Sequence, residues 1–349
     1  MKIIITGSES FIGKSTIQVL KQHGHQIVAL RHSYTEEQEQ LPERADAWIH
    51  FAWAGGDSAS KTDIDVQEYD LDMSVDVLKK AIELGCGKFV FAGSYAEYGL
   101  AQNGKSKQEY GPCEPVSEYG RAKYMFNELA SSVVNLHNQD PACRTPIKYV
   151  HMRTFSVYGP GDHSNSLISK LVNTFSAGQA AYMGPCTQLW NYIYVDDAAR
   201  AVALLCESDA EGIYNIASTE TKPLKDYVQD VYEAMNCQGS VSYNASCDNV
   251  EGESDLSPDT ARLQELGFVP EVDFRTGIRR VIEAKEKKDK ERAKMNERSN
   301  AARYDVIAAQ LNVVSGQQSK EIRQRRLLDA IEASGKSMDE ILAFLNSGD

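Results

Sequence analysis

Near its start the chain reads Lys2-Ile3-Ile4-Ile5-Thr6-Gly7-Ser8-Glu9-Ser10-Phe11-Ile12-Gly13, and this stretch decides the fold. Its β-branched part predicts a short buried strand, and the small residues that follow predict a turn into a helix. That helix is expected to run to Gln22, where His23-Gly24-His25 ends it. Gln26-Ile27-Val28-Ala29-Leu30 predicts the next strand. A βαβ unit with such a turn presents a helix N-terminus that can accept a pyrophosphate.

A second pattern lies downstream, where Tyr119 and Lys123 are four residues apart and Ser94 precedes them by 25 positions. On a helix, that spacing places the phenol and the ammonium on one face, about one turn apart. The ammonium favours the phenolate, and the serine hydroxyl can hold a substrate oxygen. The three residues together predict proton transfer at a carbinol or carbonyl, while a nicotinamide transfers the hydride.

With these blocks the chain resembles the extended short-chain dehydrogenase/reductase family, of the NAD(P)-dependent nucleotide-sugar epimerase, dehydratase and 4-ketoreductase type. The resemblance covers about residues 1–284. Its other blocks, in the family's order, are Ile49-His50-Phe51-Ala52, Ser94 to Gly99, Arg153 with Val157-Tyr158-Gly159-Pro160-Gly161-Asp162, Tyr192-Ile193-Tyr194-Val195-Asp196-Asp197, and Leu266-Gly267-Phe268-Val269-Pro270. Ser10 stands where the family usually has glycine.

The resemblance implies an α/β fold: a doubly wound parallel Rossmann sheet with a smaller α/β substrate lobe. Residues 1–160, with 190–220, are expected to form most of the cofactor domain, and 161–284 most of the substrate lobe. Residues 285–349 form a charged helical extension that the resemblance does not cover.

The resemblance also assigns candidate site residues. Catalysis falls to Ser94, Tyr119 and Lys123. The expected cofactor residues are Gly7, Ser10, Phe11, Ile12, Gly13, Arg31, His32, Phe51, Ala52, Trp53, Tyr119, Lys123 and Phe155, and the expected substrate residues are Ser94, Tyr95, Asn165 and Trp190. No metal is expected.

Composition narrows the class further. The chain has 349 residues, of which 42% are hydrophobic and 25% charged, enough for a full core. The net charge of −13 argues against nucleic acid as a partner. No apolar run reaches the roughly 18 residues of a membrane span. Seven scattered cysteines without a Cys-x-x-Cys pair indicate reduced thiols, so we expect a cytoplasmic enzyme with no membrane partner.

Cofactor choice depends on the end of the second strand, where Arg31, His32 and Ser33 follow Leu30. A carboxylate at that position would hold ribose hydroxyls and repel a 2′-phosphate, whereas a guanidinium can pair with it. NADP(H) is therefore favoured, with NAD(H) as the alternative. Only about fifteen residues separate Arg31 from the strand that begins at Ala47, so the adenine-binding acid typical of the family is not assigned.

The reaction follows from the residues after Ser94. Dehydratases of the family resemble one another in placing an acidic pair directly after this position, but here Tyr95 and Ala96 occupy it. Glu97 falls one residue late, which re-aims its side chain. Two reactions remain: reduction of a 4-keto-6-deoxy nucleotide sugar with NADPH, which is favoured, and 4-epimerisation with NAD. A third, non-catalytic reading is an NADP(H)-binding scaffold or sensor that docks a partner through its tail.

The substrate side leaves alternatives open. Asn165 is expected either to bind the nucleotide or only to cap a helix. Trp190 is expected either to stack on a base or only to pack in the core. Trp190 and its neighbours stand where the family often has a diphosphate-binding Arg. In the tail, residues 285–326 hold twelve Lys/Arg and six Asp/Glu, and Ser337-Met338-Asp339-Glu340 predicts a capping box. The resemblance implies a homodimer or higher homo-oligomer, and the tail is expected to pack on its own body, on a twin subunit or on a separate partner.

Overall fold

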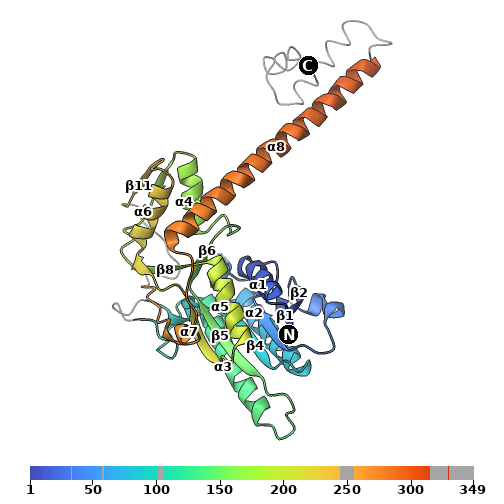
Figure 1. Ribbon diagram of the computed structural model, residues 1–349, viewed down its shortest axis with the longest axis vertical. Helices are drawn as coiled ribbons and strands as arrows, with labels where there is room; N and C mark the ends of the chain where they lie inside the picture. The colour runs from blue at the N-terminus through green and yellow to red at the C-terminus, as the bar shows by residue number, and fades with distance from the viewer. Residues whose placement is uncertain (33, 57–58, 101–105, 244–254, 315–328, 330–349) are drawn as a thin grey trace. The chain divides into compact units, whose positions relative to one another are not determined.

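The structure is a computed structural model that describes the chain except residues 33, 57–58, 101–105, 244–254, 315–328 and 330–349 (Figure 1). By contact the chain divides into two units, Met1–Ile282 and Glu283–Asp349. Within the described residues, no helix combines the length and the apolar character needed to cross a membrane. The predicted capping box at Ser337 lies outside the described residues.

A parallel sheet of six strands forms the centre of the first unit (Figure 1). Its order is β2 (Gln26–Leu30), β1 (Lys2–Thr6), β3 (Ala47–His50), β4 (Lys88–Ser94), β5 (Lys148–Thr154) and β9 (Gly212–Ile216). The strands are short and nearly continuous runs of buried residues, as expected when helices cover both faces of a parallel sheet. The predicted Rossmann-like α/β fold is confirmed.

Two pairs of helices cover the sheet. On one face α1 (Phe11–Gln22) packs beside α5 (Val195–Glu207), and on the other α2 (Ile64–Glu83) packs beside α3 (Glu118–Gln139). Each pair closes a separate apolar core. The first contains Ile3, Leu20, Ile49 and Val202, and the second contains Ile4, Leu78, Phe91 and Phe126. The carboxyl ends of the parallel strands therefore meet at one edge, where ligands of such sheets bind.

The connection after β2 is short. Between Leu30 and Ala47 the described residues form two single-turn 3-10 helices, η1 (Tyr34–Glu36) and η2 (Gln38–Gln40). Strand β3 then pairs directly with β1, Ile3 opposite Ala47 and Ile5 opposite Ile49.

The remaining elements form a smaller sheet group with its own core. Strands β10 (Thr221–Pro223), β8 (Leu189–Tyr194) and β6 (Ser156–Tyr158) make one sheet, and β11 (Ser240–Ser242) pairs with β7 (Ala180–Tyr182). Helices α4 (Leu167–Ser176) and α6 (Leu224–Ala234) pack together here. Their apolar sides join the start of α8 (Phe274–Val314) in a core rich in tyrosine and phenylalanine, while α7 (Ala261–Glu265) lies against β9.

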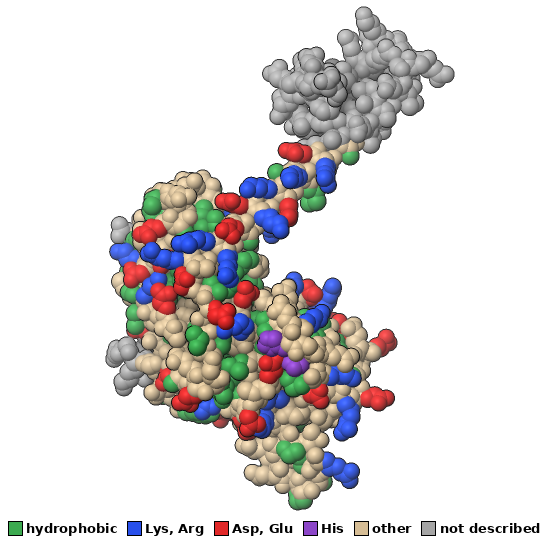
Figure 2. All heavy atoms as spheres, in the orientation of Figure 1, with side chains coloured by type: hydrophobic (Ala, Val, Ile, Leu, Met, Phe, Trp, Pro, Cys, Tyr) green, Lys and Arg blue, Asp and Glu red, His purple; other side chains and the backbone are tan. Residues whose placement is uncertain are grey.

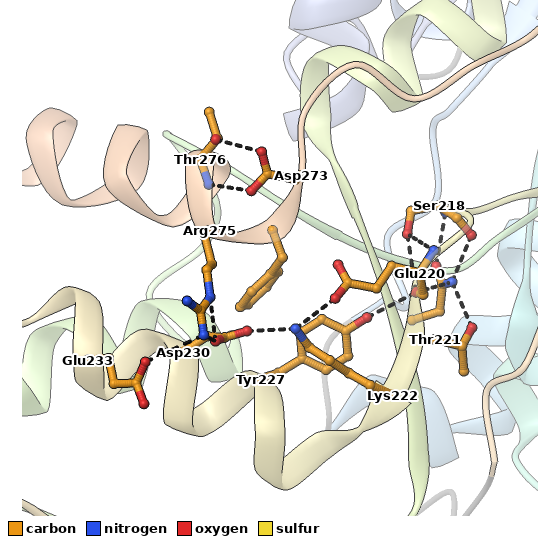
Figure 3. A network of polar contacts seen from close by, with 12 residues as sticks. Ser218, Glu220, Thr221, Lys222, Tyr227, Asp230, Glu233, Asp273, Arg275 and Thr276 are labelled. Atoms are coloured by element: carbon orange, nitrogen blue, oxygen red, sulfur yellow. Dashed lines mark hydrogen bonds and ion pairs between the residues drawn. The ribbon is translucent and has the colours of Figure 1, made fainter.

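A polar network ties this smaller part together (Figure 3). The ammonium of Lys222 bonds to Asp230 at 2.6 Å and to Glu220 at 2.8 Å, and Arg275 reaches the other oxygen of Asp230 at 2.7 Å. Burial alone would lower the pKa of Lys222, but these carboxylates raise it above its ordinary value. Both cations are thus committed to internal ion pairs.

Helix α8 passes from the first unit into the second. The part that belongs to the second unit carries charges of both signs along its surface (Figure 2), including an ion pair of 2.9 Å between Lys285 and Asp289. Such i, i+4 pairs support an exposed helix but add little stability.

Candidate active site

The glycine turn after β1 fits a dinucleotide pyrophosphate. Gly7 has a φ of +73°, and a Cβ built on it would lie 2.6 Å from the backbone nitrogen of Ala52. A Cβ on Gly13 would lie 2.5 Å from the carbonyl oxygen of Gly7. Ser10 caps α1, its Oγ accepting from the Gly13 amide at 3.1 Å. At Gly7 and Gly13 the backbone segments that follow β1 and β3 and begin α1 therefore lie too close together to accept a side chain. The absence of side chains leaves the N-terminus of α1 open to an anion.

A cavity of about 350 Å³ lies beside this turn. Seven of the predicted cofactor residues line it together: Gly7, Ser10, Arg31, His32, Phe51, Ala52 and Trp53. Its wall also contains residues that the sequence did not single out as cofactor-binding, namely Glu36, His50, Ala54, Tyr69, Asp70 and Met73. Helix α2 supplies the last three of these, and only its packing against the sheet brings them here.

The end of β2 combines charges of both signs. Arg31 is exposed at the rim of the cavity, as a contact to a 2′-phosphate requires. Glu37 folds back from the following loop, and its carboxylate accepts from the backbone amide of Arg31 at 2.6 Å and from that of His32 at 3.4 Å. A carboxylate therefore stands at this strand end, contributed from a later position than the family pattern.

Ser94 ends β4 and begins the 3-10 turn η4 (Tyr95–Tyr98). Its Oγ accepts from the Ala96 amide at 3.2 Å, and its own amide donates to Glu97 at 2.8 Å. These two bonds form a capping box that fixes the backbone of Ser94 at the carboxyl edge of the sheet.

Glu97 is fully buried behind Ser94. Both of its oxygens lie 2.9 Å from His151 Nε2, and Oε2 accepts from Arg153 Nε at 2.8 Å. Burial would raise the pKa of Glu97, but His151 and Arg153 hold it below its ordinary value. The carboxylate therefore holds the turn that contains Ser94, and His151 and Arg153 occupy both of its oxygens.

The start of α3 is fitted to the Ser94 turn. Ser117 caps the helix, its Oγ accepting from the Gly120 amide at 3.1 Å. A Cβ on Gly120 would lie 2.6 Å from the carbonyl oxygen of Ala96, so glycine lets the first turn of α3 approach η4. Tyr119 and Lys123 stand in the first two turns of this helix. Gly120, which lies between them in sequence, was not identified as important by the sequence analysis.

Lys123 is only 3% exposed. Its ammonium donates to the carbonyl oxygen of Ala92 at 2.7 Å and lies 3.7 Å from the ring centroid of Trp53 and 5.7 Å from that of Tyr119. Burial lowers the pKa of Lys123 to about 7, although Glu97 and Asp70 act in the opposite direction. A lysine with such a pKa is present in both charge states near neutrality, and its charged form would favour a phenolate at Tyr119.

The predicted substrate residues differ in how deeply they are buried. Tyr95 packs against Phe155 with a centroid distance of 6.0 Å and edge-on against Trp190 at 6.2 Å. Trp190 is half-buried, and Asn165 is exposed. The N-cap of α4 is Ser166, whose Oγ accepts from the Ser169 amide, so Asn165 is not the cap.

Six predicted cofactor residues do not line the cavity beside the glycine turn: Phe11, Ile12, Gly13, Tyr119, Lys123 and Phe155. Tyr119 and Lys123 are nevertheless joined to it through Trp53, which lines the cavity and contacts both side chains.

Comparison with known proteins decides the family. The model of the NAD dependent epimerase/dehydratase family matches residues 3–217. The chain belongs to this family. Its relatives include CDP-abequose synthase of Salmonella typhimurium, 22% identical over 80% of this chain and 97% of the relative. GDP-L-fucose synthase 1 of Arabidopsis thaliana is 23% identical over 79% of this chain and 90% of the relative.

Solved structures of family members share the fold. MoeE5 in complex with UDP-glucuronic acid and NAD superposes with a TM-score of 0.72, at 22% identity, covering 82% of this chain and 100% of that one. Thermus thermophilus UDP-glucose 4-epimerase in complex with NAD gives 0.69, at 23% identity, covering 81% and 98%. The predicted family and its enzymatic character, an NAD(P)-dependent epimerase, dehydratase or reductase of the extended short-chain type, are confirmed.

Proposed function

We propose that this family member reduces a 4-keto-6-deoxy nucleotide sugar with NADPH. The observation that carries the proposal is the state of Glu97. In a dehydratase of this family an acid beside the Ser94 position would move a carbon-bound proton, but here Glu97 is bound by His151 and Arg153 behind the turn. Tyr95 and Ala96 occupy the positions of the acidic pair. Ser94, Tyr119 and Lys123 remain, and they suffice for reduction of a ketone.

When bound, a reduced nicotinamide supplies the hydride to the C4 carbonyl carbon. Tyr119 donates its proton to the carbonyl oxygen as negative charge develops there. Ser94, whose Oγ accepts from the Ala96 amide, keeps its hydroxyl proton to donate to the same oxygen. Lys123, in its charged form, favours the Tyr119 phenolate that remains after proton transfer.

Arg31 supports the choice of NADPH. Its side chain lies exposed at the rim of the cavity beside the glycine turn, where a guanidinium can pair with a 2′-phosphate through charge-assisted bonds. The cavity fits the adenosine end of the cofactor, because the glycine turn forms one wall and α2 another.

A sugar-nucleotide 4-epimerase that uses NAD is the second candidate. The Glu37 carboxylate at the end of β2 favours it, because a negative charge there repels a 2′-phosphate. The epimerase reading also needs only the residues that the ketoreductase uses.

Measurement of the cofactor separates the two. The purified chain is denatured, the released dinucleotide is identified, and NADPH and NADH are titrated into emptied protein. Exchangeable binding with at least a tenfold preference for NADPH supports the reductase. Tightly retained NAD rejects it in favour of the epimerase.

Turnover is tested with 4-keto-6-deoxy sugars on different nucleotides, each generated by a dehydratase, while NADPH oxidation is followed at 340 nm. Tyr119→Phe is expected to lower kcat by about 10²- to 10⁴-fold because it removes the acid. The neighbouring Tyr124→Phe is the matched control on the same helix. Equal rates of the two variants would contradict the assigned role of Tyr119.

We further propose that residues 1–160, with 190–220, hold the cofactor and that 161–284 hold the nucleotide sugar. The separate aromatic core around α4 and α6 supports this division. Lys222 and Arg275 are paired with Asp230 in this lobe, and Trp190 and its neighbours stand where the family often has an Arg, so uncharged donors are expected to contribute to binding the nucleotide.

For assembly we propose a dimer formed through the outer faces of α2 and α3. Apolar side chains stand exposed along them: Ile64, Met125, Leu129 and Leu136, each at least 45% exposed. Such a row of exposed apolar groups is typical of an interaction surface.

A further inference from the structure

The ammonium of Lys123 is buried among aromatic rings. It donates a hydrogen bond to the carbonyl oxygen of Ala92 at 2.7 Å. Aromatic faces take the place of water: the ring centroid of Trp53 lies at 3.7 Å and that of Phe91 at 4.7 Å. An ammonium above an aromatic ring is attracted by the ring quadrupole, and most strongly above an indole from which water is excluded.

The indole of Trp53 is held in place from behind. Its Nε1 donates to Gln67 Oε1 at 3.0 Å, and Gln67 Nε2 donates to the carbonyl oxygens of Gly55 and Ser60 at 2.8 and 2.9 Å. Asp70 accepts from the amides of Ala54 and Gly55. Gln67 and Asp70 are both buried on α2, so the loop after β3 is tied to that helix and the ring has a defined position.

Trp53 also contacts the other catalytic residue of α3. Its ring meets that of Tyr119 edge-on, with centroids 6.2 Å apart and planes at 84°. One side chain therefore lies against both Tyr119 and Lys123, and it also lines the cavity beside the glycine turn. A residue in this position can act on the proton donor and on its neighbouring ammonium together.

The charged and titratable groups around Lys123 come from several elements. Glu97 of η4 and Asp70 of α2 favour its charged form, whereas burial opposes it. His50 of β3 is neutral near pH 7, since burial and the charge on Lys123 lower its pKa to about 3. Tyr119 lies on the same helix, and Lys61 of η3 (Ser60–Thr62) lies 5.1 Å from the ring of Tyr119.

We propose that Trp53 is a positioning residue of the active site, whose indole face holds the Lys123 ammonium beside Tyr119 and favours its charged form. This inference rests on the proposed function, in which charged Lys123 acts on Tyr119. In the sequence Trp53 directly follows the block Ile49-His50-Phe51-Ala52, and neither this spacing nor the resemblance to the family predicts its contact with Lys123.

The test uses the full chain labelled with [ε-13C]lysine, with Lys123→Met to assign the Lys123 resonance. In Trp53→Leu, loss of the aromatic face is expected to lower the charged-to-neutral ratio of Lys123 about tenfold, so its titration midpoint falls by about one pH unit. Trp53→Phe keeps an aromatic face, so its Lys123 midpoint is expected to fall by no more than half as much as in Trp53→Leu. Phe89→Leu, a core change on β4 that leaves both Trp53 and Phe91 in place, is the control and should leave the midpoint unchanged.

The alkaline limb of kcat, where Lys123 loses its proton, should move with the titration midpoint. An unchanged Lys123 midpoint in Trp53→Leu would overturn the proposal, as would a shift of equal size in Phe89→Leu. If Trp53→Leu does not fold, Trp53→Ala replaces it, and an unchanged Lys123 midpoint in that variant overturns the proposal. A Lys123 midpoint that falls by the full pH unit in Trp53→Phe also overturns it. The lysine titration needs neither sugar nor cofactor. An inactive wild-type protein would therefore reject the proposed reaction, while the titration would still test the role of Trp53.

Discussion

Replacing Lys123, the proposed catalytic lysine, is expected to stabilise the protein and, if that role is correct, to abolish catalysis. Lys123 is 3% exposed, and burial takes its pKa from 10.5 in the unfolded chain to about 7 in the fold. That difference is equivalent to about 5 kcal/mol of unfolding free energy, and the full penalty applies where Lys123 is protonated in both the folded and the unfolded state. Lys123→Met removes this penalty but also loses the contacts to Ala92 and Trp53, so we expect a net gain of about 2 to 4 kcal/mol at pH 7.

The gain must depend on pH in a defined direction. Because the folded pKa is lowered, the penalty is complete below pH 7 and disappears as pH rises from 7 to 10.5. Urea unfolding of wild type and Lys123→Met at pH 6, 7.5, 9 and 10 measures this. Lys79→Met on the exposed face of α2, where Lys79 is paired with Asp76, is the control and should show no such dependence. A stability difference between wild type and Lys123→Met that stays constant over this range would refute the reasoning.

Individual contacts lead to three further predictions. Glu37→Gln removes the carboxylate that lies against the amides of Arg31 and His32, so the affinity for NADPH should rise about tenfold over that for NADH in fluorescence titrations; equal gains for both cofactors would contradict this. Leu129→Glu places a charge on the exposed apolar face of α3 and should halve the mass measured by light scattering, whereas Lys79→Met should not. Glu97→Gln breaks a buried ion pair and should lower the unfolding free energy by about 3 kcal/mol at pH 7. Because the pKa of Glu97 is lowered in the fold, this loss should shrink only as pH falls below 4.5, the ordinary glutamate value, and through the lower folded pKa; a loss in urea unfolding that does not shrink anywhere below pH 4.5 would contradict the charged state assigned to it.

Local features of the chain were readable from sequence. Strands Lys2–Thr6 and Gln26–Leu30, and the helix from Phe11 to Gln22 between them, lie where the pattern places them. Each depends on residues close in sequence: a β-branched run, a capping serine, and Gly24 with a φ of +83° after the helix. The order of blocks along the chain was enough to predict the family, and the comparisons confirm it.

The partners of the catalytic groups came only from the tertiary structure. Asp70 and Gln67 reach the loop after β3 because α2 packs on one face of the sheet, and Glu97 meets His151 and Arg153 because β4 lies beside β5. The position of Glu97 in the sequence predicts that it is badly placed for dehydration, but does not predict what it binds.

The amino-acid sequence by itself thus determined which chemical groups this protein has and in which local elements they stand, since capping, turns and strand patterns act over a few residues. Only the tertiary structure decided the protonation of Lys123 and its contact with Trp53, seventy positions away. Desolvation and cation–π attraction depend on which surfaces the packed helices bring together, and no spacing along the chain records that.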